Sequence, residues 1–389
     1  MIYVGIDVAK SKHDCYIIDS DGTVIADVFT FENSKAGFLD LLSKIPKVSP
    51  EKIKIGLEST GHYSNNLVSF LSESGFSLAL FNPLITNLFR KAQTLRKTKT
   101  DKVDAKLIAL MLFSDDTKPY LPVSYHLQEL KSLTRHRYRL VGYRSKLKIS
   151  INRLLDIIFP ELSTVVWSVH QNSSYAMLAQ YPTPKDLSSA HLTKLTNLLK
   201  NSSRGKYGKA KAKEIKNLAQ ESIGSNSRAS AFELQQTIRL VQNTQLEIDL
   251  LDKQIKVLMK GINSPILTIP GISYTLGAII LAETLDIRRF ESPTKYLAFS
   301  GLEPSTHQSG KYIAKTASMV KRGSTYLRWA LMNAARLVSM RDPVFKAYLS
   351  KKRAEGKPFQ VAISHVAKKL SRVIYYLLSN NKTFISQSA

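Results

Sequence analysis

Cysteine is almost absent from this chain of 389 residues, in which Cys15 is the only one. A single cysteine excludes an internal disulfide and any cysteine-based zinc site. Long apolar runs are missing as well: no segment approaches 18 uninterrupted apolar residues, so we expect no transmembrane helix. The first residues, MIYVGIDVAK, begin directly with a strand pattern, so we also expect no signal peptide and a cytoplasmic protein.

Acidic residues are scarce beyond the first third of the chain. Lysine and arginine number 56 against 30 aspartates and glutamates, which gives a formal net charge of +26. Residues 1–120 hold 15 basic and 14 acidic residues, whereas the remainder holds 41 and 16. This excess indicates a polyanionic partner, although ribosomal-type and membrane-surface proteins are basic too. We therefore expect the polyanion-binding surface after residue 120.

Strand and helix patterns alternate through the first 120 residues. Asp21-Gly22 marks a hairpin turn between the second and third strands, and Ser34 is expected to cap the first helix. The predicted elements are strands at 2–8, 14–19 and 23–31, a helix at 34–45, a strand at 53–58, a helix at 64–74, a strand at 76–81 and a helix after Pro83. This order resembles the ribonuclease H-like (RuvC-like) α/β fold, in which the first and fourth strands are neighbours.

Two long amphipathic helices are predicted next. Leucine and isoleucine recur at three- and four-residue steps over 125–160, where Pro160 ends the helix, and a heptad-like repeat runs over 231–260. The pattern of the intervening segment, near 161–230, does not define its structure. We interpret 121–263 as a basic helical or coiled-coil arm that helps the protein to dimerise.

Four acidic residues of the nearly neutral α/β region form the main candidate site. Asp7 and Glu58 each end a β-rich apolar run, whereas Asp101 and Asp104 are three apart on a predicted helix and share one face. Carboxylates gathered from separate segments are what divalent metals need for cutting phosphodiesters. Their hard oxygen ligands suit Mg²⁺, with Mn²⁺ as the alternative ion. Each residue alone also has a plainer interpretation, as a turn residue or a solvated helix residue paired with a lysine.

Ser309 is the second candidate. It lies in the motif HQSGK within a last, mainly α unit, 264–389, which has helical patterns at 324–339 and 359–378. No acidic residue occurs from 304 to 340. A serine hydroxyl among cations and phosphates can act as a nucleophile if a base removes its proton. Ser-Gly in a basic loop is nevertheless common, so chemistry alone favours a structural role.

Basic residues of three segments are the candidates for contact with nucleic acid. They lie on the first long helix, in the basic stretch of the inserted segment, and after Ser309. These residues are Arg135, Arg137, Arg139, Arg144, Lys148, Arg204, Lys206, Lys311, Lys321 and Arg322.

Motifs at both ends of the chain resemble those of insertion-sequence transposases that join an N-terminal DEDD (RuvC-like) domain to a C-terminal serine-bearing domain. This is the IS-one-ten type, described as bridge-RNA-guided recombinases. The matching motifs are GIDVAK, GLEST and KTDKVDA near the start, and TIPGI, RRFESPTKYLAFSGLEPSTHQSGK and KRGSTYLRWALMNAA near the end. Within the resemblance, Asp7, Glu58, Asp101 and Asp104 take the DEDD positions and Ser309 takes the nucleophile position.

The resemblance implies three domains: a DEDD metal-binding domain (1–120), the arm (121–263) and a serine-bearing transposase domain (264–389). It implies recombination by strand exchange, in which the serine attacks a DNA phosphate and becomes covalently linked to the strand end, assisted by the carboxylates and Mg²⁺. The implied partners are donor and target DNA, a structured guide (bridge) RNA and further copies of the chain, as a dimer or dimer of dimers, with no membrane. Such a protein is prokaryotic and acts at the nucleoid. The 161–230 segment departs from the shorter members of the family.

Three other interpretations stay open. The chain could be a metal-dependent nuclease of the junction-resolvase kind, in which Ser309 is structural. It could be a non-catalytic nucleic-acid-binding protein that uses the same fold as a scaffold. A phosphotransferase of the sugar-kinase/actin fold also begins with a strand ending in Gly-x-Asp, but no later glycine-rich nucleotide loops follow and the basic remainder would be unexplained.

Overall fold

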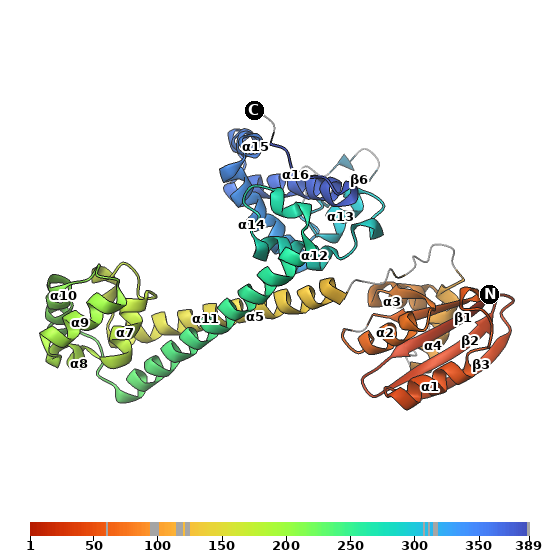
Figure 1. Ribbon diagram of the computed structural model, residues 1–389, viewed down its shortest axis with the longest axis horizontal. Coiled ribbons are helices and arrows are strands. Elements are labelled where there is room, and N and C mark those ends of the chain that lie inside the picture. Colours follow the sequence, from red (N-terminus) through yellow and green to blue (C-terminus); the bar gives the residue numbers. More distant parts are fainter. Residues whose placement is uncertain are drawn as a thin grey trace. The chain divides into compact units, whose positions relative to one another are not determined.

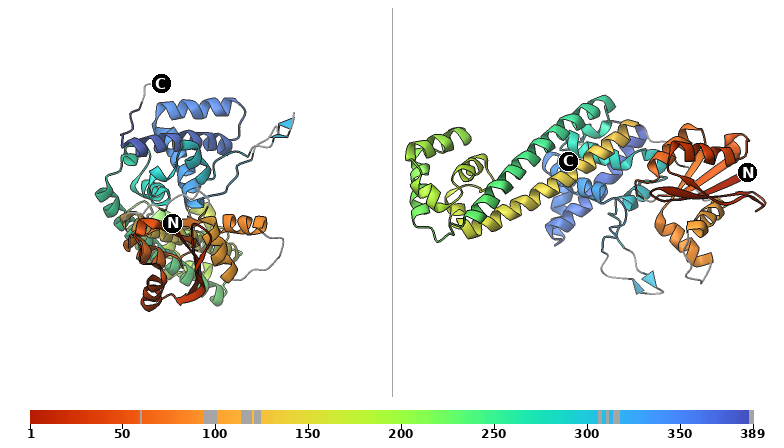
Figure 2. Two further views of the ribbon diagram at one scale, coloured as in Figure 1. Left: turned by 90° about the vertical axis from the view of Figure 1, so that its right-hand side faces the viewer. Right: turned by 90° about the horizontal axis from the view of Figure 1, so that it is seen from below.

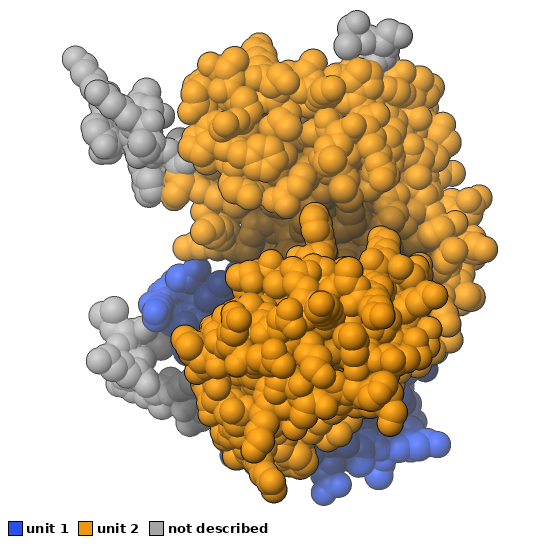
Figure 3. All heavy atoms as spheres, turned by 90° about the vertical axis from the view of Figure 1, so that its left-hand side faces the viewer, with its two compact units in different colours: residues 1–122 blue, residues 123–389 orange. Residues whose placement is uncertain are grey.

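The structure is a computed structural model, and the chain divides into two compact units, Met1–Pro122 and Val123–Ala389 (Figure 3). The residues described are 1–59, 61–93, 101–113, 120, 125–305, 308–309, 312–313 and 318–386. For Asp101, Tyr125, 308–309 and 312–313 only the backbone is described. Each unit is described by itself below.

The first unit is built on a mixed sheet. Its strands are β1 (Ile2–Val8), β2 (Lys12–Asp19), β3 (Val24–Glu32), β4 (Ile53–Glu58) and β5 (Ser77–Phe81), and its helices are α1 (Lys35–Lys44), the 3₁₀ turn η1 (Pro50–Lys52), α2 (Asn65–Glu73), α3 (Pro83–Gln93) and α4 (Asp101–Met111). The predicted order of elements is confirmed, with bounds that differ by one or two residues. Ser34 caps α1 as expected, because its Oγ accepts a hydrogen bond from the Gly37 N–H at 3.1 Å.

The strands follow the order β3-β2-β1-β4-β5. The neighbours β1, β2 and β3 are labelled in Figure 1. β1, β4 and β5 run parallel to one another, whereas β1 with β2 and β2 with β3 are antiparallel. β1 and β4 are thus neighbours, as the sequence predicted. Side chains alternate between the two faces of a strand, and here the two faces have different coverings. Val4 and Ile6 of β1 and Ile55 and Leu57 of β4 share a core with α1 and α2. The opposite face lies against α4.

The second unit is helical over most of its described length. It contains α5 (Tyr125–Ile158), α6 (Leu162–Val165), α7 (Asn172–Gln180), α8 (Pro184–Ser189), α9 (Leu192–Ser202), α10 (Lys209–Gln220), α11 (Arg228–Ile262), η2 (Pro265–Thr268), α12 (Tyr274–Thr284), η3 (Ile287–Arg289), α13 (Pro293–Phe299), β6 (Gln308–Ser309), β7 (Tyr312–Ile313), α14 (Thr325–Arg341), α15 (Pro343–Ala354) and α16 (Phe359–Asn380). None of the helices in the described residues is long and apolar enough to span a membrane.

The two long helices α5 and α11 lie side by side as an antiparallel pair (Figures 1 and 2). Their polar contacts show the direction: Arg137 of α5 meets Asp252 of α11, and Arg153, 16 positions later on α5, meets Glu233. The partner's number falls as the α5 number rises, which only an antiparallel pair produces. Both helices were predicted, and Pro160 follows the end of α5 as expected.

Short helices occupy the segment whose sequence pattern defined no structure. Helices α6 to α10, which we call the tip helices, pack around their own core at one end of the α5–α11 pair (Figure 2). A larger core at the other end joins α12 to its neighbours. Residues 276–284 of α12 are buried on every side, and α13, α14 and α16 contribute to the same core.

Candidate functional site

Asp7 and Glu58 lie at the same level of two neighbouring parallel strands. The β1–β4 register pairs Gly5 with Gly56 and Ile6 with Leu57, so the next residue on each strand is the carboxylate. Because Ile6 and Leu57 point into the core with α1 and α2, Asp7 and Glu58 belong to the opposite face. The sheet therefore brings these two predicted residues together on the face that α4 covers.

Two glycines let α4 approach this face closely. A Cβ on Gly5 would lie 2.3 Å from both the carbonyl oxygen of Ala105 and the amide nitrogen of Ala109, and one on Gly56 would lie 3.0 Å from Ile108. A side chain at Gly5 would collide with the backbone of the helix, whereas one at Gly56 would press on the side chains of Phe81, Ile108 and Leu112. The glycines of the two motifs GIDVAK and GLEST thus have a packing role beside the carboxylates.

The direction of α4 sets the position of its acidic turn. Phe113, just beyond the end of the helix, stacks on Tyr3 with ring centroids 4.6 Å apart, whereas Ala105 and Ala109 lie over Gly5. The helix therefore runs opposite to β1, and its first turn reaches the level of Asp7. That turn carries Asp101 and Asp104.

Helix α3 supplies partners to two of the carboxylates. Thr86 Oγ1 donates a hydrogen bond to Glu58 Oε2 at 2.7 Å. One turn later, Arg90 Nη1 lies 3.1 Å from Asp104 Oδ1, and its Nη2 donates to Asn87 Oδ1 at 2.8 Å. The side chains of Arg90 and Asp104 are only 20% and 12% exposed, so this ion pair is largely shielded from water. The sequence reasoning missed both Thr86 and Arg90.

The chemistry of the acidic residues suits a hard divalent cation. Asp7, Glu58 and Asp104 offer carboxylate oxygens, the ligands that Mg²⁺ and Mn²⁺ prefer. Among the described side chains, which do not include that of Asp101, no three acidic, histidine or cysteine groups are close enough together to hold a metal ion. The carboxylate of Asp104 is turned to Arg90 instead. The donor set fits the ion, and the metal-binding role of the four residues stays a prediction.

Ser309 belongs to the second unit and lies within residues 302–322, which we call the Ser309 segment. It forms the two-residue strand β6 with Gln308, and it is opposite Tyr312 of β7 in an antiparallel pair. Near the two ends of the segment, the Ser305 N–H donates to the carbonyl of Ser318 at 2.7 Å, and the Val320 N–H donates to the carbonyl of Glu303 at 2.9 Å. The side chain of Ser309 and all of Lys311 lie outside the described residues.

The base of this segment is closely packed through two glycines with positive φ. Gly301 has φ +68°, and an added Cβ would lie 2.4 Å from the carbonyl oxygen of Arg322. Gly323 has φ +100°, and an added Cβ would lie 2.0 Å from the carbonyl oxygen of Phe299. Only glycine meets both requirements without strain. The motifs that contain these glycines, SGLEP and KRGST, thus hold the two ends of the Ser309 segment together.

Two protein-family models match the chain. One, described as a transposase of the DEDD type found in IS110 elements, matches residues 4–160. The other, described as the transposase of the IS116/IS110/IS902 family, matches residues 263–350. The chain belongs to this transposase family.

Relatives align along nearly the whole transposase. It is 25% identical to an uncharacterised 44.8 kDa protein of insertion element IS116 from Streptomyces clavuligerus, over 98% of this chain and 96% of that protein. It is 25% identical to the putative mini-circle transposase for IS117 from Streptomyces coelicolor, over 100% and 96%. It is also 26% identical to a pilin gene-inverting protein of Moraxella bovis, over 98% and 97%. The transposase is accordingly a DNA-processing enzyme by family.

Three of the predicted nucleic-acid contacts make pairs inside the transposase. Arg135 Nε donates to Glu283 of α12 at 2.6 Å, and Arg137 Nε donates to Asp252 of α11 at 2.7 Å. Arg144 is hydrogen-bonded to Gln245 of α11. The sequence showed the charges of α5 but not their partners, which lie more than 100 residues away. These pairs align the helices, and the contribution of the three arginines to nucleic-acid binding stays a prediction.

The other predicted contacts are more accessible. Arg139, Arg204, Lys206, Lys321 and Arg322 are exposed, and Lys148 is half-buried. Arg204 and Lys321 adopt left-handed backbone conformations, with φ of 55° and 56°. Burial lowers the pKa of Lys148, and the nearby charge of Arg144 adds to that effect. The charges of the five exposed residues therefore face solvent.

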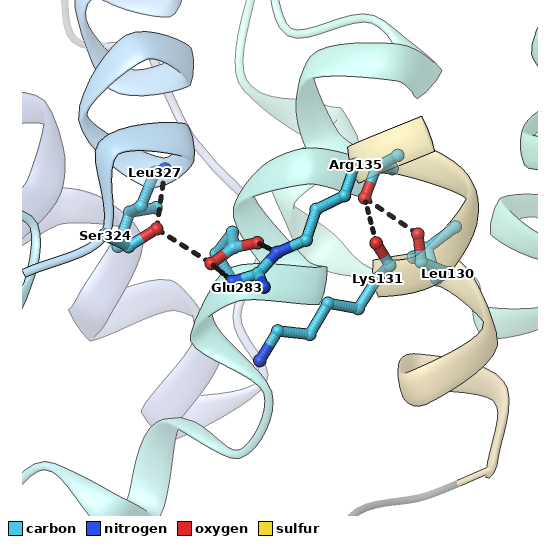
Figure 4. Close-up of polar contacts among 7 residues, drawn as sticks. Leu130, Lys131, Arg135, Glu283, Ser324 and Leu327 are labelled. Carbon is cyan, nitrogen blue, oxygen red and sulfur yellow. Dashed lines mark hydrogen bonds and ion pairs between the residues drawn. The ribbon is translucent and has the colours of Figure 1, made fainter. Parts of the chain in front are cut away.

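Glu283 is the most consequential residue that the sequence reasoning missed (Figure 4). Its side chain is 2% exposed, and both its oxygens accept hydrogen bonds from Arg135, at 2.6 and 2.9 Å. Ser324 Oγ donates to it at 2.7 Å and accepts from the Leu327 N–H at 3.1 Å, which caps α14. One carboxylate therefore connects α5, α12 and the start of α14. The sequence signal that could have identified Glu283 is a lone acidic residue inside the apolar run LGAIILAET.

The pKa of Glu283 results from opposing effects. Burial alone raises it, but hydrogen bonds from Arg135 and Ser324 and the positive charges of Arg135 and Lys131 outweigh burial, so the pKa lies below its ordinary value of 4.5. Burial lowers the pKa of Lys131, and the carboxylate of Glu283 opposes that change. The carboxylate is thus held ionised between cations.

Asp14 is a second acidic residue that the sequence reasoning left out of the site. The β1–β2 register places it directly opposite Asp7, so the two belong to the same face of the sheet. Asp14 is 6% exposed, and its Oδ1 accepts a hydrogen bond from Thr30 Oγ1 at 2.5 Å. Its position at the start of a strand gave no sign that the register would bring it beside Asp7.

Proposed function

We propose that this transposase cuts and rejoins DNA strands by strand exchange, with Ser309 as the nucleophile. In this proposal Asp7, Glu58, Asp101 and Asp104 form the acidic half of the active site. The observation that carries it is the shared level of Asp7, Glu58 and the first turn of α4 on one face of the sheet, in a chain of a DEDD-type transposase family. The three domains are 1–120, 121–263 and 264–389.

The proposed fold of the first domain is ribonuclease H-like. Its support is the strand order β3-β2-β1-β4-β5, with the first three strands antiparallel and β4 and β5 added in parallel to β1. In that fold, carboxylates of the first and fourth strands lie beside a helix that carries further acidic residues. The close approach of α4 to β1, with acidic residues in its first turn, supports this proposal.

The four carboxylates would hold Mg²⁺, or Mn²⁺ in its place. Such an ion polarises a phosphoryl oxygen and stabilises the charge that develops during displacement. The residues of the chain would position it from three elements, β1, β4 and α4, and Thr86 would keep the Glu58 carboxylate oriented through its hydrogen bond. Arg90 would have to share or release Asp104 when the ion binds.

The proposed covalent step is a transesterification. Ser309 Oγ forms a bond to phosphorus, and the bond from phosphorus to one deoxyribose oxygen breaks. The hydroxyl proton goes to a base, the departing oxygen takes up a proton, and nothing is oxidised or reduced. Reversal with a different strand end rejoins the DNA and frees the serine. The contacts at Gly301 and Gly323 hold the two ends of the segment that carries this serine close together.

A structured RNA is the proposed guide. Pairing delegated to RNA suits a protein whose charge is spread over the arm and the end of the chain, without an obvious base-reading motif. The exposed cations of α5 and of the tip helices support a long polyanion as the binding partner. We further propose that the protein acts as a dimer or dimer of dimers, so that domains of different copies build one site.

The test compares two variants on the same DNA. The purified transposase, with the RNA that copurifies with it, is incubated with plasmid DNA carrying the element's ends and with Mg²⁺. A denaturing gel then measures the protein–DNA adduct. Ser309→Ala is expected to abolish the adduct, and Asp104→Asn to reduce cleavage at least about 100-fold through loss of a ligand. Lys346→Ala, an exposed change on α15, is the control.

One alternative remains, a metal-dependent junction resolvase in which Ser309 is structural. A nearly neutral domain that carries the carboxylates, followed by a basic remainder, fits that function equally well. It predicts that Ser309→Ala keeps cutting DNA and that the wild type forms no adduct. That result would overturn the serine mechanism while leaving the acidic site in place.

A further inference from the structure

Trp167 is exposed to an unusual degree. Its side chain is 93% exposed, in the connection between α6 and α7 at the end of the α5–α11 pair. An indole ring that faces water to this degree buries very little of its large apolar surface and so contributes little to folding. Residues 161–262, which include the tip helices, fall between the two matched family regions. Packing within the chain therefore does not explain the exposure of Trp167.

The backbone around Trp167 is held firmly. The Trp167 N–H donates to Tyr207 Oη at 3.1 Å, and Gln171 Nε2 donates to the same oxygen at 2.8 Å. On the other side, Lys211 Nζ donates to the carbonyl of Val165 at 2.9 Å. The ring is thus presented to solvent by a segment with several fixed contacts, a preorganised arrangement that favours binding.

A surface groove of about 500 Å³ adjoins the ring. Its lining combines apolar surface with hydrogen-bonding groups: Asn152, Asp156, Phe159, Ser163, Trp167 and His170. An aromatic face beside a groove with donors and acceptors matches a planar ligand that has polar edges. An unpaired nucleobase has this chemistry.

The surroundings are positively charged. Residues 161–227 hold nine lysines and arginines against four acidic residues. The tie between Trp167 and Tyr207 brings the ring beside the basic stretch that begins at Arg204. Arg204, Lys206 and Lys209 are exposed there. This charge favours a polyanion over a neutral protein surface as the partner. The tip helices face the viewer in Figure 3.

We propose that an unpaired base of single-stranded RNA stacks on Trp167, with its polar edge in the adjoining groove. The backbone phosphates on either side would meet Arg204 and Lys206. The choice of RNA rests on the proposed guide RNA, whereas the binding site itself rests on Trp167, the groove and the charge. The tip helices then have a role of their own, which is to hold an unpaired part of the RNA.

Fluorescence tests the stacking directly, because the chain has only two tryptophans. The Trp329→Phe variant leaves Trp167 as the sole indole, and a short oligouridylate is titrated into it. We expect quenching that saturates, with Trp167→Ala in the otherwise natural chain binding about 5- to 150-fold more weakly, as loss of one stacked base predicts. Trp167→Phe should lose less. The exposed ring predicts unchanged melting temperatures for both.

The control and the competing results are distinct. Ile223→Ala removes another exposed apolar side chain, 89% accessible, on the loop whose amide contacts Glu161, and it should not change RNA binding. The inference fails if Trp167→Ala binds oligouridylate as the wild type does, or if oligodeoxythymidylate binds at least as tightly as the RNA. It also fails if both exposed-residue variants change the oligomeric state instead. The DNA adduct assay is separate, so failure here leaves the proposed strand exchange untouched.

Discussion

Single side chains decide how charge is used in this transposase. Arg135 and Arg137 were predicted to contact nucleic acid, yet each has a carboxylate partner across the helical interface. Asp104 was predicted to bind metal, and in this structure it pairs with Arg90. In each case the residue type was visible in the sequence, but its partner depends on tertiary contacts between distant segments. The sequence therefore predicts which positions are charged, but not which of these charges are neutralised by a partner.

The buried Glu283 predicts an acid-sensitive element of stability. Its folded pKa is lowered, so its contribution is fully present above the ordinary value of 4.5 and is lost as pH falls through the folded pKa. Glu283→Gln should therefore lower the free energy of unfolding at pH 7, by about 1–3 kcal/mol for a disrupted, partly buried pair. The same variant should lose less stability than the wild type between pH 5 and pH 3. Urea unfolding across this pH range measures both effects.

A matched change separates this effect from loss of charge in general. Glu247→Gln removes an exposed carboxylate from α11 and should leave stability within about 0.5 kcal/mol at pH 7. If Glu283→Gln shows the same pH dependence as the wild type, the carboxylate does not carry the acid response.

Helix α4 shows how packing at the scale of an element positions the site. Gly5→Ala places a Cβ 2.3 Å from the backbone of Ala105 and Ala109, and a helix backbone cannot move aside as a side chain does. We expect a loss of about 3 kcal/mol or more, at the upper end for overpacking. Cleavage should also fall, because the first turn of α4 moves away from Asp7. Urea unfolding and DNA cleavage at a temperature where the variant is folded measure the two effects.

Gly142→Ala on α5 is the control. Nothing lies within 4 Å of the added Cβ, so the change should stabilise the helix by about 0.5–1 kcal/mol. A Gly5→Ala variant with normal stability and normal cleavage would show that α4 adjusts freely, and that its close approach is not what positions Asp104.

The strands and the long helices were predictable from their apolar patterns, whereas the tip helices were not. β1 to β5, α5 and α11 follow directly from alternating or heptad-like apolar patterns. Helix α8, Pro184–Ser189, has too few residues to show a period, although Thr183 and Asp186 form a capping box. The neighbouring positions of Asp7 and Glu58 followed from the order of elements. Thr86, Arg90 and Asp14 could not be assigned to the site, because their places depend on packing and register.

At the scale of the whole molecule, charge is divided along the chain. The first 120 residues are nearly neutral and the remainder carries a net charge of +25. Cations whose partners lie within the protein add little to binding a polyanion, whereas exposed ones release counterions when they meet phosphates. The net charge of the chain therefore overestimates how many cations are available to bind a polyanion. The exposed cations beside Trp167 are expected to contribute more than the paired arginines of α5.

This difference predicts how RNA affinity depends on salt. For the double variant Arg204→Ala/Lys206→Ala, the slope of log K against log salt should become shallower by about 1.4, since each single-strand phosphate contact contributes about 0.7. Arg153→Ala removes a guanidinium that lies 2.6 Å from Glu233, and its slope should match that of the wild type. Filter binding of oligouridylate over a series of salt concentrations measures all three slopes. Equal slopes for the double variant and the wild type would place the RNA elsewhere on the transposase, because a phosphate contact cannot be lost without changing the number of counterions released.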